Sequence, residues 1–293
     1  MNFWYDPHHI YWTIDLLTVL LMGMVHGITP DEHTWPITFS YSIGSYSTKG
    51  GIRSGLYFSL AFTLQRAIAS ELAYFALVRF FTQSGAEQIV YMIVGLVMLL
   101  SGYYIRFRHK TLHLFPWIEK LAPAVKKEGE PVPAKLALIH GFIAGWGTGA
   151  FATIIYTVIS PNMPNAWVAF LPGLFYGIGT MIMQMLIGGL FGRWIERQNL
   201  DHLAKSYIGR FVSANTLLYG GILFVVLGFL ELTDPKISDW GVSTGLPIFN
   251  LDSINLALLL TIFIVGGVGG YSIFKAIRKV KNEATKALAS KSN

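Results

Sequence analysis

Residues 168–192 read Val-Ala-Phe-Leu-Pro-Gly-Leu-Phe-Tyr-Gly-Ile-Gly-Thr-Met-Ile-Met-Gln-Met-Leu-Ile-Gly-Gly-Leu-Phe-Gly, and none of them is charged. A helix needs about 20 mostly apolar residues to cross the roughly 30 Å hydrocarbon core of a bilayer. Comparable apolar runs recur along the 293-residue chain, at residues 10–28, 55–81, 86–106, 136–158, 213–232 and 254–274. This pattern predicts an all-α membrane protein with about seven transmembrane helices.

The composition favours the same class. Hydrophobic residues make up 53% of the chain and charged residues 13%, whereas an average soluble domain is about 25% charged. The absence of cysteine excludes disulfides, thiolate metal sites and cysteine nucleophiles. The sequence has no Walker motif, and we do not expect an enzyme. The net charge of +6 comes from Lys and Arg between the apolar runs, so we expect no nucleic-acid partner.

The basic residues also predict the orientation, because Lys and Arg are retained on the cytoplasmic side. With the N-terminus outside, all but three of the 22 Lys and Arg lie inside; the exceptions are Arg66, Arg79 and Lys236. The first residues lack a basic segment and an Ala-x-Ala site, so we expect no cleaved signal peptide. We therefore predict a multi-pass protein of the cytoplasmic (inner) membrane with a cytoplasmic C-terminus.

The two halves of the chain resemble each other. Gly55-Leu-Tyr-Phe-Ser-Leu-Ala matches Gly173-Leu-Phe-Tyr-Gly-Ile-Gly, and a second pair of segments shares its glycines, Gly95 and Gly102 with Gly221 and Gly228. With three helices in each half, the second copy would enter the membrane upside down, which is the 3+3 inverted-repeat plan of many secondary transporters.

This repeat divides the chain into four parts. We expect a first three-helix repeat with a broken first helix over residues 1–119, and a polar, proline-containing cytoplasmic linker over 120–135. The second three-helix repeat would occupy 136–232. Residues 233–293 would form an outer loop, the seventh helix and a basic cytoplasmic tail.

One match between the halves has two interpretations. Val25-His26-Gly27 resembles Ile139-His140-Gly141, yet His26 ends its apolar run and His140 begins one. Either the match is accidental, or the first helix continues past a break through residues 35–45. In the second case residues 29–33 lie at membrane depth instead of at the surface.

The residues at this break could bind a metal ion. The stretch His26-Gly-Ile-Thr-Pro-Asp-Glu-His33 places His26, Asp31, Glu32 and His33 beside a proline that interrupts the helix. Unwound backbone at membrane depth is tolerated where it is buried or lines a wet cavity. Imidazole nitrogen with carboxylate oxygen suits nickel, cobalt, iron, manganese or zinc. The alternative is that Asp31 and Glu32 cap a half-helix that begins near Thr29.

This stretch resembles the signature of the nickel/cobalt transporter family and its urease-accessory-type membrane relatives, His-x4-Asp-His in an early helix, often His-Ala-Leu-Asp-Pro-Asp-His. His26, Pro30 and Asp31 match it, whereas Glu32 stands where the second histidine belongs and His33 follows one place later. The segments at 55–63 and 174–180 are similar to two further family segments but lack their histidine and aspartate. The resemblance implies the family's fold, a transported divalent ion such as nickel or cobalt, and no permanent cofactor.

Four more ionisable residues lie in apolar runs, where a charge at the bilayer centre costs about 2.5–3.5 kcal/mol. We predict that Asp15, Arg66, Glu71 and His140 line a transport path or gate it. Arg66 could meet Asp31 or Glu32, with a fixed salt bridge as the alternative role. Glu71 could meet His140. Asp15 lies about 16 Å along the helix from His26 and marks a second point on the path or a hydrated outer position.

The last predicted span contains a glycine run and is followed by a basic tail. The glycines of residues 266–270 predict close helix packing. The basic tail that follows, residues 275–293, either binds anionic lipid or is the ordinary inner flank of a span.

We therefore predict a secondary transporter of a divalent transition-metal cation. A small-anion exporter of the same fold is one alternative, because Arg66 is basic and family ligands are missing. A non-transporting membrane subunit of a larger complex is another. The expected partners are the lipid bilayer, the metal ion, and a second copy of the chain or a membrane subunit.

Overall fold

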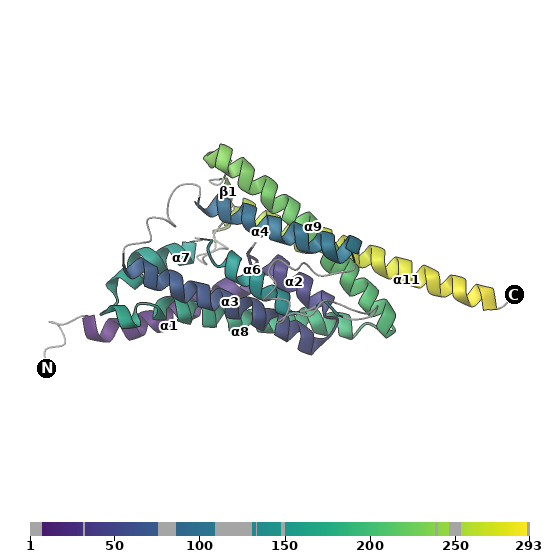
Figure 1. Ribbon diagram of the computed structural model, residues 1–293, viewed down its shortest axis with the longest axis horizontal. Coiled ribbons are helices and arrows are strands. Elements are labelled where there is room, and N and C mark those ends of the chain that lie inside the picture. Colours follow the sequence, from purple (N-terminus) through teal and green to yellow (C-terminus); the bar gives the residue numbers. More distant parts are fainter. Residues whose placement is uncertain are drawn as a thin grey trace.

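The structure is a computed structural model that describes residues 8–31, 33–75, 86–108, 131–132, 134–147, 150–237, 240–245 and 253–291. The described chain is mostly helical (Figure 1). Its α-helices are α1 (His8–Ile28), α2 (Trp35–Gly44), α3 (Thr48–Tyr74), α4 (Ala86–Tyr103), α6 (Ala137–Ala144), α7 (Ala150–Ile154), α8 (Leu171–Glu196), α9 (His202–Thr233), α10 (Leu256–Ile262) and α11 (Gly270–Lys291). Shorter π-helical or 3-10 turns are η2 (Tyr104–Arg108), η3 (Ala134–Leu136), η4 (Ile155–Ile159), η5 (Ser160–Asn162), η6 (Ala166–Val168), η7 (Pro235–Ile237) and η8 (Phe263–Gly269).

Two short strands, β1 (Gly241–Ser243) and β2 (Ser253–Asn255), are a small exception to the all-α prediction. They pair antiparallel, with Val242 opposite Ile254, in the segment predicted as an outer loop. Three-residue strands add one ladder between α9 and α10 and leave the helical core unchanged.

Within the described residues, four helical segments are long and apolar enough to cross a membrane: Gln88–Phe107, Ala166–Glu196, His202–Thr233 and Leu258–Asn282. Large apolar side chains are exposed around the outside of the bundle, among them Leu64 and Leu190 at 57% and 65% exposure. Soluble monomers seldom expose such extensive apolar surface. The chain thus has the helical character of an all-α membrane protein. The 27-residue α3 is comparably long but more polar, because it carries Lys49, Arg53, Arg66 and Glu71.

The helices form two layers with short helices between them (Figure 1). One layer contains α1, α3 and α8, and the other contains α4 and α9. The short helices α2 and α6 lie between the layers, and residues 36–44 of α2 are all buried. The C-terminal part of α11 projects beyond the bundle.

The central helices α3 and α8 pack antiparallel through glycines. A Cβ atom on Gly55 would lie 2.2 Å from the Gln184 carbonyl oxygen, and one on Gly173 would lie 2.0 Å from the Arg66 carbonyl oxygen. Only glycine permits such an approach. These two contacts are reciprocal, because Gly173 and Gln184 each lie 118 positions after Gly55 and Arg66.

The other helix pairs repeat this reciprocity. Gly102 packs on the backbone of Leu218 in α9, and Gly228 packs on Met92 in α4. Gly228 lies 126 positions after Gly102, and Leu218 lies 126 positions after Met92. The glycine matches between the two halves therefore occupy equivalent packing positions. Their spacing reflects contacts that exclude any larger side chain.

The first helix also follows this pattern, and the two interpretations of its break prove compatible: the His-Gly match is accidental, and the helix nevertheless continues past the break as α2. Gly23 packs on the Tyr176 carbonyl and Gly141 packs on the Phe58 carbonyl, again 118 positions apart. His26 thus corresponds to Ala144, one helical turn after His140, and the match between the two His-Gly pairs is accidental.

The break itself lies inside the bundle. Gly27, just before it, faces Thr180 of α8, and Ser42, after it, faces Gly188 of the same helix. Helix α2 therefore continues α1 along α8, as the second interpretation requires, and the break lies opposite the middle of α8.

Two predicted helix ranges were wrong. The run at 136–158 is not one helix, because α6 ends at Ala144 and α7 begins at Ala150. This second break lies along the middle of α3, where a Cβ on Gly145 would lie 2.4 Å from Gln65 Oε1. Helix α9 begins at His202 instead of residue 213, because Asp201 caps it through the Ala204 N–H and its first turns are polar.

Candidate functional site

The break between α1 and α2 is organised by Asp31. Its carboxylate accepts a hydrogen bond from the His33 N–H at 2.9 Å, and its carbonyl accepts the N–H of Trp35 at 3.0 Å. The Thr29 hydroxyl donates to the Val25 carbonyl at 2.8 Å and closes the end of α1. The capping interpretation therefore holds in part: Asp31 does cap the turn that leads into the next helix, which begins at Trp35 and not near Thr29.

His26, Asp31 and His33 come together at this break. The His26 Nδ1 atom lies 3.5 Å from Asp31 Oδ2, and the His33 Nδ1 atom lies 3.8 Å from Asp31 Oδ1. All three residues are more than 90% buried. Burying a carboxylate is costly unless partners compensate for the lost water, and two imidazoles supply such partners. Glu32 lies outside the described residues.

These separations are close to those of ligands around a metal ion. Two ligands placed 2.0–2.2 Å from a tetrahedral ion lie about 3.4 Å apart. However, the two histidines approach different oxygens of Asp31, and no group of three His, Asp or Glu side chains in the described part of the chain is already arranged as a metal site. Binding one ion through all three residues would require the rings to turn.

Aromatic rings enclose the two histidines. The His26 ring stacks on Tyr176 and Phe62, with centroid distances of 5.3 and 5.8 Å. The His33 ring stacks on Tyr91 at 4.9 Å. On its other side, a Cβ on Gly147 would lie 2.6 Å from His33 Nε2. These contacts hold the two histidine rings in place beside Asp31.

Arg66 lies at the centre of the bundle, 4% exposed. One guanidinium nitrogen, Nη1, donates to the Gly147 carbonyl and to the Tyr156 hydroxyl, both at 2.9 Å. The guanidinium carbon is 4.6 Å from the Phe62 ring centre and 5.5 Å from that of Tyr176, which favours a buried cation. Asp31 is close enough to interact electrostatically with Arg66, but the expected direct ion pair between them is not formed.

Gln184 occupies the equivalent position on α8 and was not predicted. Its Nε2 atom donates to the Gly27 carbonyl at 2.9 Å, just before the first break, as Arg66 donates to Gly147 at the second break. Each break thus has a carbonyl satisfied by a side chain from a central helix of the other half. The 118-position offset of the Gly55 and Gly173 segments would have located Gln184 as the partner of Arg66.

Glu71 and His140 do not meet, and this expected pair was wrong. Gly141 packs beside Phe58, 13 positions before Glu71 in α3, which is about 20 Å along a helix axis. Instead, His140 Nδ1 lies 3.4 Å from the Tyr41 hydroxyl. Within the described chain, His140 Nε2 and Glu71 Oε2 are buried without a hydrogen-bond partner.

Asp15 lies in α1, partly buried, and at a distance from the break. The 11 residues that separate it from His26 correspond to about 16 Å of helix. Asp15 therefore does not join the group around Asp31, and its predicted role as a separate point on a path is untested.

Several buried polar atoms of the central helices have no hydrogen-bond partner among the described residues. They belong to Ser59, Thr63 and Gln65 of α3 and include Gln184 Oε1 of α8. Most buried polar groups in proteins are hydrogen-bonded, so a concentration of exceptions indicates a place where water or a polar ligand is accommodated. Thr63 lies against Gly177 of α8, and Gln65 lies against Gly145 at the second break.

Comparisons with family models, with curated proteins and with solved structures find no match. The family resemblance and the function that it implies therefore rest on the residues of the sequence alone.

Proposed function

We propose that this protein is a secondary transporter of a divalent transition-metal cation, in the class of nickel and cobalt. The observation that carries the proposal is the pair of imidazole nitrogens within 4 Å of one buried carboxylate, at a break in the first helix. Imidazole and carboxylate ligands suit these metals better than calcium or magnesium, which favour oxygen alone.

The proposed topology has seven spans, with the N-terminus outside and two inverted three-helix halves. It is supported by the reciprocal glycine contacts between α3 and α8 and between α4 and α9. It is also supported by the two helix breaks, each of which lies against the middle of a central helix. In transporters built from inverted repeats, broken helices of this kind hold the substrate near the bilayer midplane.

Arg66 acts in this proposal as the internal counter-charge. It interacts electrostatically with Asp31 in the absence of a direct ion pair, so it can compensate for the buried carboxylate while no cation is bound. An arriving divalent cation takes over that role. Because Arg66 also holds the second break through Gly147, cation binding at the first break would be coupled to the second.

Proteoliposome flux tests the proposal. Vesicles that contain a metal-sensing dye should show protein-dependent entry of nickel or cobalt, and Asp31→Asn should abolish it while the variant remains folded by size-exclusion chromatography. His202→Ala serves as a control because this histidine lies on α9 beside Tyr46, away from the break. Equal flux through the wild type and Asp31→Asn would contradict the assignment.

A second candidate, a small-anion transporter of the same fold, is favoured by one observation. Arg66 is a buried cation whose direct hydrogen-bond partners in the described chain are neutral oxygens. Such a group could bind an anion that reaches the centre of the bundle. Anion flux that is lost in Arg66→Gln, together with no metal flux in the wild type, would favour this candidate.

A further inference from the structure

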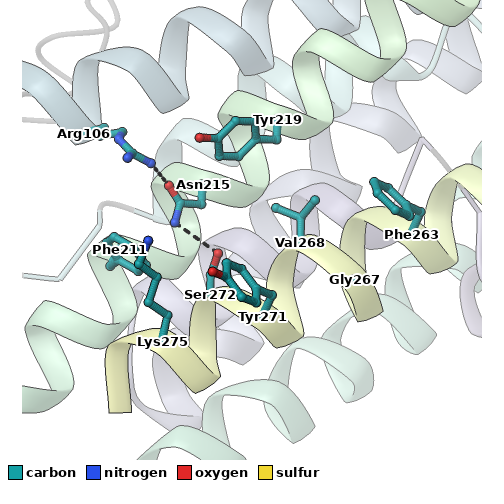
Figure 2. Close-up of a pocket in the computed structure, with 10 residues that line it drawn as sticks. All are labelled: Arg106, Phe211, Asn215, Tyr219, Phe263, Gly267, Val268, Tyr271, Ser272 and Lys275. Atoms are coloured by element: carbon teal, nitrogen blue, oxygen red, sulfur yellow. Dashed lines mark hydrogen bonds between the residues drawn. The ribbon is translucent and has the colours of Figure 1, made fainter. Parts of the chain in front are cut away.

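We propose that a cavity between α9, η2 and the last span binds the phosphate headgroup of an anionic phospholipid. The cavity has a volume of about 420 Å³, and none of the residues of the break is among its lining residues (Figure 2). This inference goes beyond the transported substrate. It rests on the orientation proposed above, which places Arg106 and Lys275 on the cytoplasmic side of the membrane.

The cationic end of the cavity is formed by Arg106 and Lys275 (Figure 2). Arg106 donates to the Asn215 Oδ1 atom, and Asn215 Nδ2 donates to the Ser272 hydroxyl at 3.0 Å. This chain of hydrogen bonds joins η2, α9 and α11 and holds the guanidinium at the rim. A guanidinium has five N–H donors, so the bond to Asn215 leaves donors for a ligand.

The cavity is built for an anion. None of its described lining residues is acidic, and neither Arg106 nor Lys275 forms an ion pair with a described carboxylate. Both cations instead lie over aromatic rings, the Arg106 guanidinium carbon 5.9 Å from the Phe211 ring centre and Lys275 Nζ 5.9 Å from that of Tyr271. A phosphate in the cavity would therefore meet two cations and no competing carboxylate from the described lining. Arginine also binds phosphate oxygens in a two-pronged geometry that neutral ligands do not provide.

The other end of the cavity is apolar and open to the outside of the bundle. Phe263, at this end, is 58% exposed, whereas Tyr271, 64% exposed, lies beside Lys275, whose Nζ atom is 5.9 Å from its ring centre. A Cβ atom on Gly266 or on Gly270 would contact nothing within 4 Å. The prediction that this glycine run packs closely against other helices is therefore wrong at these two positions. These two glycines instead leave open space on the surface of the last span, where an acyl chain could lie.

The position of the cations identifies the source of the anion as a lipid. Arg106 lies at the end of one candidate span, Gln88–Phe107, and Lys275 lies in the last part of another, Leu258–Asn282. In the proposed orientation both ends face the cytoplasm, where the leaflet carries anionic lipids. A headgroup at Arg106 and Lys275 would leave its acyl chain level with Phe263.

Native mass spectrometry of the full chain in detergent tests this proposal. Phosphatidylglycerol is titrated against phosphatidylcholine with the same acyl chains, and the fraction of protein that carries one lipid is measured. We expect saturable binding of one phosphatidylglycerol, and at least about tenfold weaker binding in the double variant Arg106→Gln/Lys275→Gln, because each basic residue contributes a factor of roughly five. The single variant Lys275→Gln leaves the Arg106–Asn215–Ser272 hydrogen bonds intact and should weaken binding about fivefold.

The matched control is Arg278→Gln/Lys281→Gln, which removes two charges from the same helix outside the cavity. It should change the affinity less than about threefold in detergent, where no charged bilayer surface is present. Equal weakening by both double variants would overturn the cavity assignment in favour of the basic tail. Equal binding of the two lipids would overturn it as well.

Two other occupants are distinguished in the same experiment. Displacement of phosphatidylglycerol by millimolar inorganic phosphate, with equal affinity for phosphate alone, would assign the cavity to a small anion instead of a lipid. A dimer that persists without lipid and dissociates in Gly266→Leu/Gly270→Leu would show that a second copy of the chain covers the surface at Gly266 and Gly270. Either result would contradict a lipid site.

Discussion

Arg66 and Gln184 lie at equivalent positions on two antiparallel central helices, and each donates a hydrogen bond to a carbonyl beside a helix break in the other half of the chain. The two bonds have the same length, 2.9 Å, but one donor is charged and the other is neutral. The charged donor, Arg66, interacts electrostatically with Asp31. Because only Arg66 is charged, we expect a cation bound at Asp31 to affect Arg66 more than Gln184.

Replacing Arg66 by Gln should raise the affinity for a divalent cation about tenfold. The reason is electrostatic: Arg66 repels an ion bound at Asp31, and removing one charge at short range in a buried site is worth at least about 1.4 kcal/mol. Isothermal titration with nickel or cobalt measures the change. Gln184→Leu is the matched control, because it removes a neutral donor and should cost about 1–3 kcal/mol of stability with little change in cation affinity. Lower cation affinity in Arg66→Gln would argue against a counter-charge.

The glycine contacts of the central helices should resist even a methyl group. Gly55→Ala and Gly173→Ala place a Cβ against backbone oxygen atoms that cannot move independently, so each should destabilise the bundle by about 1–3 kcal/mol or more. Thermal unfolding in detergent measures this loss. Gly266→Ala, where a Cβ contacts nothing within 4 Å, should be neutral or slightly stabilising. Similar melting temperatures for all three variants would contradict the packing described here.

Gly147 should matter for metal binding through His33. A methyl group at Gly147 would displace the His33 ring. A methyl group at Gly145, two positions before Gly147, would instead meet the end of the Gln65 side chain. We expect Gly147→Ala to weaken metal binding at least about fivefold, an effect of about 1 kcal/mol, and Gly145→Ala to leave it within about twofold. Competition with a metal indicator dye provides the measurement. Equal affinities would show that His33 is not a ligand.

The proposed orientation can be tested by single-cysteine labelling, because the chain contains no cysteine. Lys236→Cys lies after α9 and should react with a membrane-impermeant maleimide on intact cells. Lys205→Cys lies near the start of the same helix and should react only after the membrane is opened. The opposite labelling pattern would place the N-terminus inside.

The sequence was sufficient for the membrane class and for much of the helix packing. Long apolar runs predict helices directly. The glycine matches at Gly55/Gly173 and Gly95/Gly221 were read as a sign of an internal repeat, and the structure places these glycines in equivalent helix contacts. The grouping of His26, Asp31 and His33 followed from their short separation in sequence around a proline.

Other features depend on contacts between distant segments and could not be predicted from local patterns. The second break was hidden, because residues 136–158 contain no proline and their apolar character continues across it. The Arg66 partners, Gly147 and Tyr156, come from this second broken segment. Because that break was not predicted, we expected a carboxylate, Asp31 or Glu32, as the partner. Glu71 and His140 are compatible in charge, but their helix positions keep them apart.

The central claim, that the first break binds a transition-metal cation, is tested most directly by metal content. The full chain is incubated in detergent with nickel, cobalt, iron, manganese or zinc in turn, desalted, and measured by elemental mass spectrometry beside His26→Ala/His33→Ala and the buried-histidine control His140→Ala. We predict close to one ion per wild-type chain for at least one metal, loss of that ion in the double variant, and retention in His140→Ala. Absence of bound metal from the wild type under every condition, or equal metal in the double variant, would contradict the claim.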